Sequence, residues 1–255
     1  MIISKEIISN IKTDSLFFDH LSEQLGVPFK KFGNGIEYEI KLSYNSSAPI
    51  VDINRMISDV LESSGYLSNR CETKSDYQVS FFQDDNSKRE LSVFVYENRP
   101  MLKIKRHSVV TFHEFPVFKS DESYEYDREK IFHLLMDDNV LFFGNMRKTR
   151  CKDFIINPFS GLVFASAVTQ CETLLDCRIQ RQYEIEYYGH FEIQNLPISE
   201  DLILNELYSI SSKLICKSSL MMAPSYETKF DFTTLSNPCS INKQDIIDYL
   251  QELLK

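Results

Sequence analysis

Two short segments with the alternating pattern of β-strands each carry a Glu-x-Glu pair, and no other Glu-x-Glu occurs in the 255-residue sequence. The pairs are Glu37 and Glu39 in residues 35–42, and Glu184 and Glu186 in residues 182–188. Successive side chains of a strand point to opposite faces, so the two glutamates of each pair share a face. If both faces point inward, the four carboxylates repel each other unless a hard cation lies between them, and oxygen ligands suit Mg²⁺ or Mn²⁺. The pattern therefore predicts a divalent metal site.

Each pair alone also fits a strand with one solvated face, because such strands commonly alternate polar with apolar residues. The segments between the two pairs favour the metal site. Residues 102–106 and 146–152 carry basic side chains at alternate positions. Basic residues concentrated on a few strands of an acidic protein are consistent with an anion that is held locally, such as a phosphate chain.

The overall composition limits the class of function. A net charge of −9 argues against non-specific binding along duplex nucleic acid, because that binding relies on a basic surface. The hydrophobic content of 43% is typical of a globular protein. No stretch approaches the length of an apolar membrane span, and residues 1–6 lack a signal-peptide layout. Six cysteines without a Cys-x-x-Cys spacing favour reduced thiols. We therefore expect a cytoplasmic protein with no membrane partner.

The chain shows no repeat, low-complexity run or Pro/Ser-rich linker, so we expect one domain over residues 1–255. Its parts are a helical lead-in over 1–30, a core over about 35–190 and a helical extension over 197–255. Further helices are predicted over 52–65, with Asp52 as the cap, over 127–137, over 199–214 with Ser199 as the cap, and over 241–254. The last helix is amphipathic and could pack back or bind a partner protein. Strands are predicted over 77–82, 89–96, 101–105, 147–156, 162–170 and 178–188, besides the opening segment at 35–42.

Seven or eight antiparallel strands with charged residues alternating inward predict an α+β fold, a closed eight-stranded antiparallel β-barrel with flanking helices. A barrel of this size holds one ligand in its lumen. Closure brings the first and last strands together, which would place the two Glu-x-Glu pairs side by side.

In this order the motifs resemble those of the triphosphate tunnel metalloenzymes, the superfamily that joins CYTH proteins with the metal-dependent RNA 5′-triphosphatases of capping systems. Its members have an opening strand with Glu-x-Glu-x-Lys, basic middle strands and a closing strand with Glu-x-Glu. The opening motif is similar to Glu37, Glu39 and Lys41, and the closing motif to Glu184 and Glu186. The resemblance covers about residues 35–190.

The resemblance implies metal-dependent hydrolysis of the γ-phosphate of a triphosphate. The four glutamates would be the catalytic residues: they would hold one or two Mg²⁺ or Mn²⁺ ions that orient a water, and one could act as a base. Basic side chains would neutralise the phosphate oxygens. These substrate-binding candidates are Lys41, Arg89, Lys103, Lys105, Arg106, Lys148, Arg150 and Arg178.

Two features bear on the branch of the superfamily. Residues 170–183 separate Thr169 from Glu184, a longer connection than CYTH members usually have, which favours the RNA triphosphatase branch. Both branches commonly carry an inward Asp on the penultimate strand, where this chain offers Ser166 or Thr169. The missing acid is consistent with altered metal binding, with an active tunnel of different surroundings, or with a non-catalytic relative.

The leading prediction is a triphosphatase that acts on RNA 5′-triphosphate ends or on nucleoside triphosphates. Within the same fold, the alternatives are an inorganic tripolyphosphatase, a thiamine triphosphatase and an adenylyl cyclase. From another class, a non-catalytic module that binds triphosphates or RNA ends stays open. The histidines, His107, His113 and His190 among them, show no metal-ligand spacing, so surface or core roles are expected for them.

Overall fold

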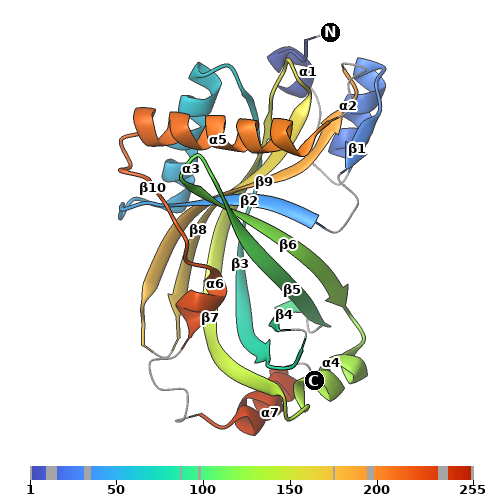
Figure 1. The fold of residues 1–255 in the computed structure, drawn as a ribbon, viewed down its shortest axis with the longest axis vertical. Helices are drawn as coiled ribbons and strands as arrows, with labels where there is room; N and C mark the ends of the chain where they lie inside the picture. Colours follow the sequence, from blue (N-terminus) through green and yellow to red (C-terminus); the bar gives the residue numbers. More distant parts are fainter. Residues whose placement is uncertain are drawn as a thin grey trace.

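Ten strands of the described residues form one antiparallel sheet that closes on itself (Figure 1). This computed structural model describes residues 2–9, 16–31, 36–86, 88–96, 99–174, 176–193, 198–234 and 241–253. Eight of the strands make a barrel, which the pairing of β9 with β2 closes. In spatial order they are β2 (Ile36–Ser43), β9 (Ile179–Phe191), β8 (Leu162–Thr173), β7 (Val140–Ile156), β3 (Leu67–Gln83), β4 (Arg89–Tyr96), β5 (Arg99–Phe112) and β6 (Phe115–Glu125). The predicted closed eight-stranded α+β barrel is therefore confirmed.

Two short strands extend this barrel at its seam, the line along which β2 pairs with β9 and closes the barrel. The first, β1 (Phe29–Lys31), pairs with the last residues of β9, and the second, β10 (Ala223–Pro224), pairs with the end of β2. The second pairing is important for the site, because it attaches the C-terminal part of the chain to the strand that carries Glu37 and Glu39.

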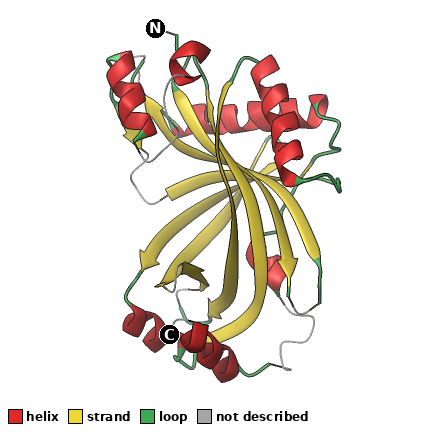
Figure 2. Ribbon diagram, turned by 180° about the vertical axis from the view of Figure 1, so that it is seen from behind, coloured by secondary structure: helices red, strands yellow, loops and turns green. Residues whose placement is uncertain are grey.

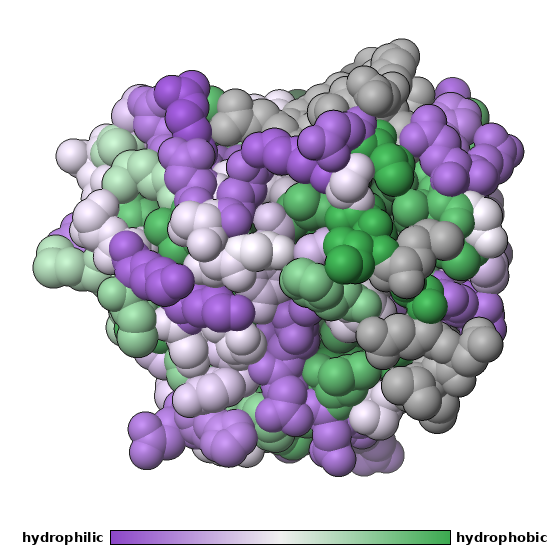
Figure 3. All heavy atoms as spheres, turned by 90° about the horizontal axis from the view of Figure 1, so that it is seen from above, coloured by the Kyte–Doolittle hydropathy of each residue, from purple (hydrophilic) through white to green (hydrophobic). Residues whose placement is uncertain are grey.

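Helices cover the two ends of the barrel (Figures 1 and 2). One end carries α1 (Lys5–Ser9), α2 (Phe17–Leu25), α3 (Ile50–Ser63) and α5 (Glu200–Lys217), and the other end carries α4 (Arg128–Leu135) and α7 (Lys243–Leu253). The short helix α6 (Lys229–Thr233) lies beside β7. Seen from the α5 end, hydrophilic residues cover much of the surface, and hydrophobic residues gather mainly on one side (Figure 3).

Amphipathic faces hold these helices to the barrel. Along α5 the buried residues Ile203, Leu207, Ile210 and Leu214 recur at helical spacing and join a core cluster with strands β2, β8 and β9. Ser199 caps this helix by accepting a hydrogen bond from the backbone N–H of Leu202, as predicted.

The C-terminal helix packs on its own barrel. Ile247 and Leu250 of α7 are fully buried in a cluster with α4 and with strands β3, β4 and β5. Lys243 fixes the start of α7 by donating to the backbone carbonyls of Asp137 and Val140. The apolar face that could have bound a partner protein is therefore occupied within the chain.

No helix among the described residues is long and apolar enough to cross a membrane.

Several strands are longer than predicted, and one was not predicted. The sequence placed strands over 77–82 and 101–105, whereas β3 begins at Leu67 and β5 extends to Phe112. The strand β6 was not predicted, because most residues over 119–125 are polar. Those polar residues face a charged lumen on one side and solvent on the other, so hydrophobic alternation is lost.

The connection between β8 and β9 corrects one argument from the sequence. The strand β8 continues past its predicted end to Thr173, and β9 begins at Ile179, so only residues 174–178 separate them, and Thr169 pairs directly with Gln182. The predicted long connection is wrong, and it no longer favours the RNA triphosphatase branch. The predicted helix at 52–65 also begins earlier, at Ile50, so Asp52 lies in the first turn and Pro49 takes the cap position.

Candidate active site

The barrel encloses a cavity of about 600 Å³ whose lining combines opposite charges. The acidic side chains that line it are Glu37, Glu39, Glu90, Glu122, Glu184 and Glu186. The basic side chains that line it are Lys31, Lys41, Lys103, Lys105, Lys148, Arg150, Lys152 and Lys229. All four glutamates of the two Glu-x-Glu pairs therefore share one lumen, together with five of the eight predicted substrate-binding residues.

Barrel closure brings the two Glu-x-Glu pairs together. In the pairing of β2 with β9, Glu39 lies opposite Glu186, and Lys41 lies opposite Glu184. Directly opposed residues of an antiparallel pair have Cβ atoms about 4.5–5.5 Å apart. The side chain of Lys41 lies 3.3 Å from the Glu39 carboxylate and over the ring of Phe118, so this lysine partly neutralises the seam.

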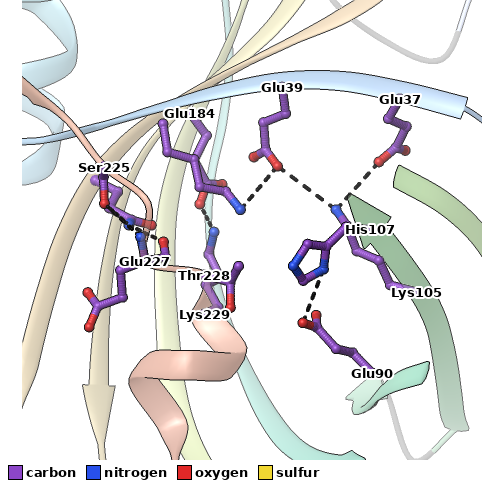
Figure 4. Close-up of polar contacts among 12 residues, drawn as sticks. Glu37, Glu39, Glu90, Lys105, His107, Glu184, Ser225, Glu227, Thr228 and Lys229 are labelled. Carbon is purple, nitrogen blue, oxygen red and sulfur yellow. Dashed lines mark hydrogen bonds and ion pairs between the residues drawn. The ribbon is translucent and has the colours of Figure 1, made fainter. Parts of the chain in front are cut away.

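A second acidic centre comes from β6. Lys105 Nζ lies 2.8 Å from Glu122. It also lies 3.8 Å from Glu37 and 3.9 Å from Glu39 (Figure 4). Lys103 also pairs with Glu122. The two lysines outweigh the effect of burial and keep the pKa of Glu122 below its ordinary range. In turn these carboxylates raise the pKa of Lys105, although burial opposes this.

The lumen has more carboxylates at the seam than its cations neutralise. Burial, and then repulsion from Glu186 and Glu122, raises the pKa of Glu37 to about 9. Burial, and then repulsion from Glu39, also raises the pKa of Glu186. For Glu39, burial acts upward, but the ammonium groups around it bring its pKa down to about 2. At neutral pH Glu37 therefore holds a proton that a bound cation could displace.

The opposite wall of the lumen is basic. On β7 the side chains of Lys148, Arg150 and Lys152 all line the cavity. Burial, and then repulsion from Arg150, lowers the pKa of Lys148 to about 8, and the same causes lower the pKa of Lys152 to about 8. Asp76 on the neighbouring strand β3 holds Arg150 at 2.8 Å. Buried cations that repel one another in this way favour binding of an anion.

The C-terminal segment contributes a further cation. Lys229, at the start of α6, pairs with Glu184 inside the lumen (Figure 4). Burial, and then repulsion from Lys148, lowers the pKa of Lys229 well below its ordinary value.

Hydrogen bonds to the inner face of β9 fix this segment. Gln182 donates to the hydroxyl of Ser225 at 3.1 Å and to the backbone carbonyl of Glu227 at 2.8 Å. Gln180 donates to the carboxylate of Glu227 at 2.6 Å. Thr228 and Asp231 then form a reciprocal capping box that starts α6.

Three of the four glutamates at the seam are available as oxygen ligands for a hard cation. Glu37, Glu39 and Glu186 offer oxygen ligands, and burial together with repulsion between carboxylates raises the pKa of Glu37 and of Glu186. Glu184 is instead held by Lys229. Among the described residues, no three acidic, histidine or cysteine side chains are already grouped closely enough to hold a metal ion. Metal binding at the seam would therefore require these side chains to converge.

Three of the predicted substrate-binding residues do not line the lumen. Arg89 donates to the side chain of Gln83 at 2.8 Å, and Arg106 lies on the opposite face of β5 from Lys105. Arg178 pairs with Asp176 and donates to the backbone carbonyl of Thr234. The alternation of side chains along a strand explains Arg89 and Arg106, because their sequence neighbours Glu90 and Lys105 point inward.

The prediction also missed several lumen residues. Glu122 lies on the unpredicted strand β6, and Lys152 continues the alternation of Lys148 and Arg150 by one further step. The period of two could have identified Lys152. Nothing local in the sequence indicates Lys229, because only the tertiary structure brings α6 to β9.

Comparison with known proteins gives the following similarities. No family model matches the chain, and no curated protein matches it. Among solved structures, a conserved hypothetical protein from Pyrococcus furiosus is 12% identical with a TM-score of 0.46, covering 76% of this chain and 98% of the other. The Mimivirus capping enzyme triphosphatase is 9% identical with a TM-score of 0.43, covering 79% and 98%. The S. pombe RNA triphosphatase is 11% identical with a TM-score of 0.33, covering 96% and 97%.

Proposed function

We propose that the lumen hydrolyses the terminal phosphoanhydride bond of a triphosphate with the help of a divalent metal ion. The observation that carries this proposal is the pairing of an acidic seam with a basic wall inside one cavity of about 600 Å³. A triphosphate chain carries several negative charges, and its hydrolysis depends mainly on positioning and on electrostatic stabilisation. The lumen supports both needs, because it offers cations to the phosphates and carboxylates to a metal.

Each wall has a distinct role in this proposal. The side chains of Lys148, Arg150, Lys152 and Lys229 bind phosphate oxygens. Glu37, Glu39 and Glu186 would hold Mg²⁺ or Mn²⁺, which supplies Lewis-acid polarisation of the phosphate when bound. When no metal is present, the carboxylates at the seam repel the phosphate groups of a substrate. Binding of the metal and binding of the triphosphate should therefore support each other.

Aromatic side chains favour a substrate that carries a nucleoside. Phe94, Tyr124 and Tyr188 also line the lumen. Bases that extend from a triphosphate stack readily on such rings. We therefore place the 5′-triphosphate end of RNA first and free nucleoside triphosphates second. Inorganic tripolyphosphate and thiamine triphosphate remain alternatives, and cyclisation of ATP by an adenylyl cyclase activity is a further one.

A specific observation also favours a binding module without catalysis. Lysine side chains already pair with Glu39, Glu122 and Glu184. Such a lumen could hold an anion through its basic wall and leave the seam without metal. This second candidate predicts triphosphate binding that does not depend on Mg²⁺ or Mn²⁺ and that releases no phosphate.

Phosphate release tests the two candidates directly. The assay uses 5′-triphosphate RNA, ATP and tripolyphosphate, each with Mg²⁺ or Mn²⁺, on the wild type and on the double variant Glu39→Gln/Glu186→Gln. We expect metal-dependent release by the wild type and a loss of at least about 100-fold in the double variant. Release that survives in the double variant would contradict the proposed site. Binding without release would favour the binding module, and cyclic AMP among the ATP products would indicate cyclisation.

A further inference from the structure

Three inward side chains form a row across neighbouring strands of the lumen. Ser120 on β6 lies opposite Glu37 on β2, and it also lies opposite His107 on β5. Paired strands are about 4.8 Å apart, so the row extends about 10 Å from the acidic seam to the imidazole. This row connects the proposed metal site to a histidine for which the sequence suggested no chemistry.

His107 is oriented from two sides. Its Nδ1 atom lies 3.2 Å from the carboxylate of Glu90 on β4 (Figure 4). Its ring also meets the ring of Phe118 edge to face, with the centroids 5.9 Å apart. Both His107 and Glu90 line the cavity. With Nδ1 directed at a carboxylate, Nε2 is the nitrogen that remains for a ligand or a proton.

The serine between them has an unused hydroxyl. Ser120 is 1% exposed, and its Oγ has no hydrogen-bond partner in the part of the chain that the structure describes. A buried hydroxyl usually has a partner, because an unpaired polar group inside a protein is costly. Its position between Glu37 and His107 suits a hydrogen bond to a water or to a phosphate oxygen. This is a second observation that directs a ligand to the same row.

We propose that His107, oriented by Glu90, is the general base of the proposed phosphate release, an inference that rests on the proposed function. The oxygen of a water bonds to the terminal phosphorus while the bond from that phosphorus to the bridging oxygen breaks. The electron pair of the broken bond leaves with the shortened phosphate chain. One proton of the water passes to Nε2 of His107, and the imidazolium later releases it to solvent. The carboxylate of Glu90 stabilises the imidazolium, as carboxylates do in other His–carboxylate pairs.

The charges around the ring are consistent with this role. Glu90 faces it from β4, Lys105 is the next inward residue on its own strand, and Glu37 lies beyond Ser120 on β2.

The test compares the wild type with His107→Gln, Glu90→Gln and the matched control His133→Gln, whose histidine lies on the outer helix α4. His107→Gln should lower kcat about 100-fold or more and change KM less than about threefold, because general bases contribute 10²–10⁴-fold to rate. In the His107→Gln variant, the fall in rate at acidic pH should also disappear. Glu90→Gln should show a smaller loss of kcat, and His133→Gln should behave as the wild type.

Chemical rescue separates catalysis from a structural role. Free imidazole should restore part of the activity of His107→Ala, and calorimetry should show that this variant still binds tripolyphosphate. Wild-type kcat in His107→Gln would overturn the inference and leave the proposed function intact. Loss of tripolyphosphate binding without imidazole rescue would also overturn it, because it would indicate a structural histidine. A wild type that releases no phosphate would refute both proposals.

Discussion

At the scale of single residues, Glu37 is the side chain that reports most directly on the charge of the lumen. Its pKa lies at about 9 because the carboxyl is buried and because Glu186 and Glu122 repel its charge. It therefore keeps its proton near neutral pH, and it hydrogen-bonds to Glu122. A cation at the seam would have to displace this proton, so metal binding should tighten as the pH rises toward 9.

The substitution Glu37→Gln tests this charge state through stability. The folded pKa of Glu37 is raised above its ordinary value of 4.5, so its contribution to stability is complete below pH 4.5 and is lost as the pH rises through 9. Glutamine stays neutral at every pH and avoids this loss. We expect Glu37→Gln to become increasingly more stable than the wild type between pH 5 and pH 9, as measured by urea unfolding without metal. Glu23→Gln, on the exposed face of α2, is the control, and a stability difference for Glu37→Gln that does not change with pH would contradict the assignment.

The residues of the site were predictable wherever strand parity alone decides. The inward positions of Glu37 and Glu39, and of Lys103 and Lys105, follow from a period of two. Lys229 was not predictable, because it reaches the lumen from a helix about 40 residues beyond β9.

At the scale of elements, a buried carboxylate fastens α3 to the barrel. Asp153 on β7 is 3% exposed, and its carboxylate accepts from Asn54 at 2.8 Å and Ser58 at 2.8 Å on α3, and from Ser68 at 3.3 Å on β3. It thus joins three elements on the side of the barrel that α3 covers.

Replacing Asp153 by Ala should leave these buried donors without an acceptor. We expect a loss of about 2–4 kcal/mol in the free energy of unfolding, because each unsatisfied buried group costs about 1–3 kcal/mol. Unfolding in urea measures this loss of stability. The control Asp52→Ala, in the exposed first turn of α3, should cost less than about 1 kcal/mol. Equal losses in the two variants would contradict the anchoring role of Asp153.

The position of α6 against the barrel depends on a glycine in β7. A Cβ atom at Gly144 would lie 2.1 Å from the backbone oxygen of Thr233, so only glycine lets α6 approach this strand. Gly144→Ala should displace α6 and with it Lys229. We expect this variant to lose about 1–3 kcal/mol of stability and to bind tripolyphosphate more weakly. Lys229→Met should weaken binding by a similar factor with a much smaller effect on stability, and full binding by both variants would contradict the role of α6.

Elements with clear hydrophobic alternation were predicted from the sequence, and elements at the charged lumen were less well predicted. The helix α5 and its cap were found because Ser199 and the apolar spacing that follows it act locally. The strand β6 was missed, because burial against charged neighbours rather than hydrophobic alternation stabilises its polar half.

At the scale of the whole molecule, the net charge of −9 and the basic wall of the lumen act together. An acidic exterior disfavours phosphate backbones in general, whereas the lumen attracts a short chain of phosphates. Binding should therefore be selective for a triphosphate end. We expect a 5′-triphosphate RNA to bind at least about tenfold more tightly than the same RNA with a 5′-hydroxyl, since one charge-assisted contact alone is worth about that factor. Equal affinity of the two RNAs would indicate binding outside the lumen.

We propose that one lumen holds both a triphosphate on its basic wall and a metal on its acidic seam. The most direct test is a crystal structure with Mn²⁺ and a non-hydrolysable triphosphate analogue, read through the anomalous signal of the metal. We expect a manganese peak beside Glu37, Glu39 and Glu186, with phosphate oxygens against Lys148, Arg150 and Lys152. A triphosphate bound outside the barrel, or one that fills the lumen with no metal at the seam, would contradict it.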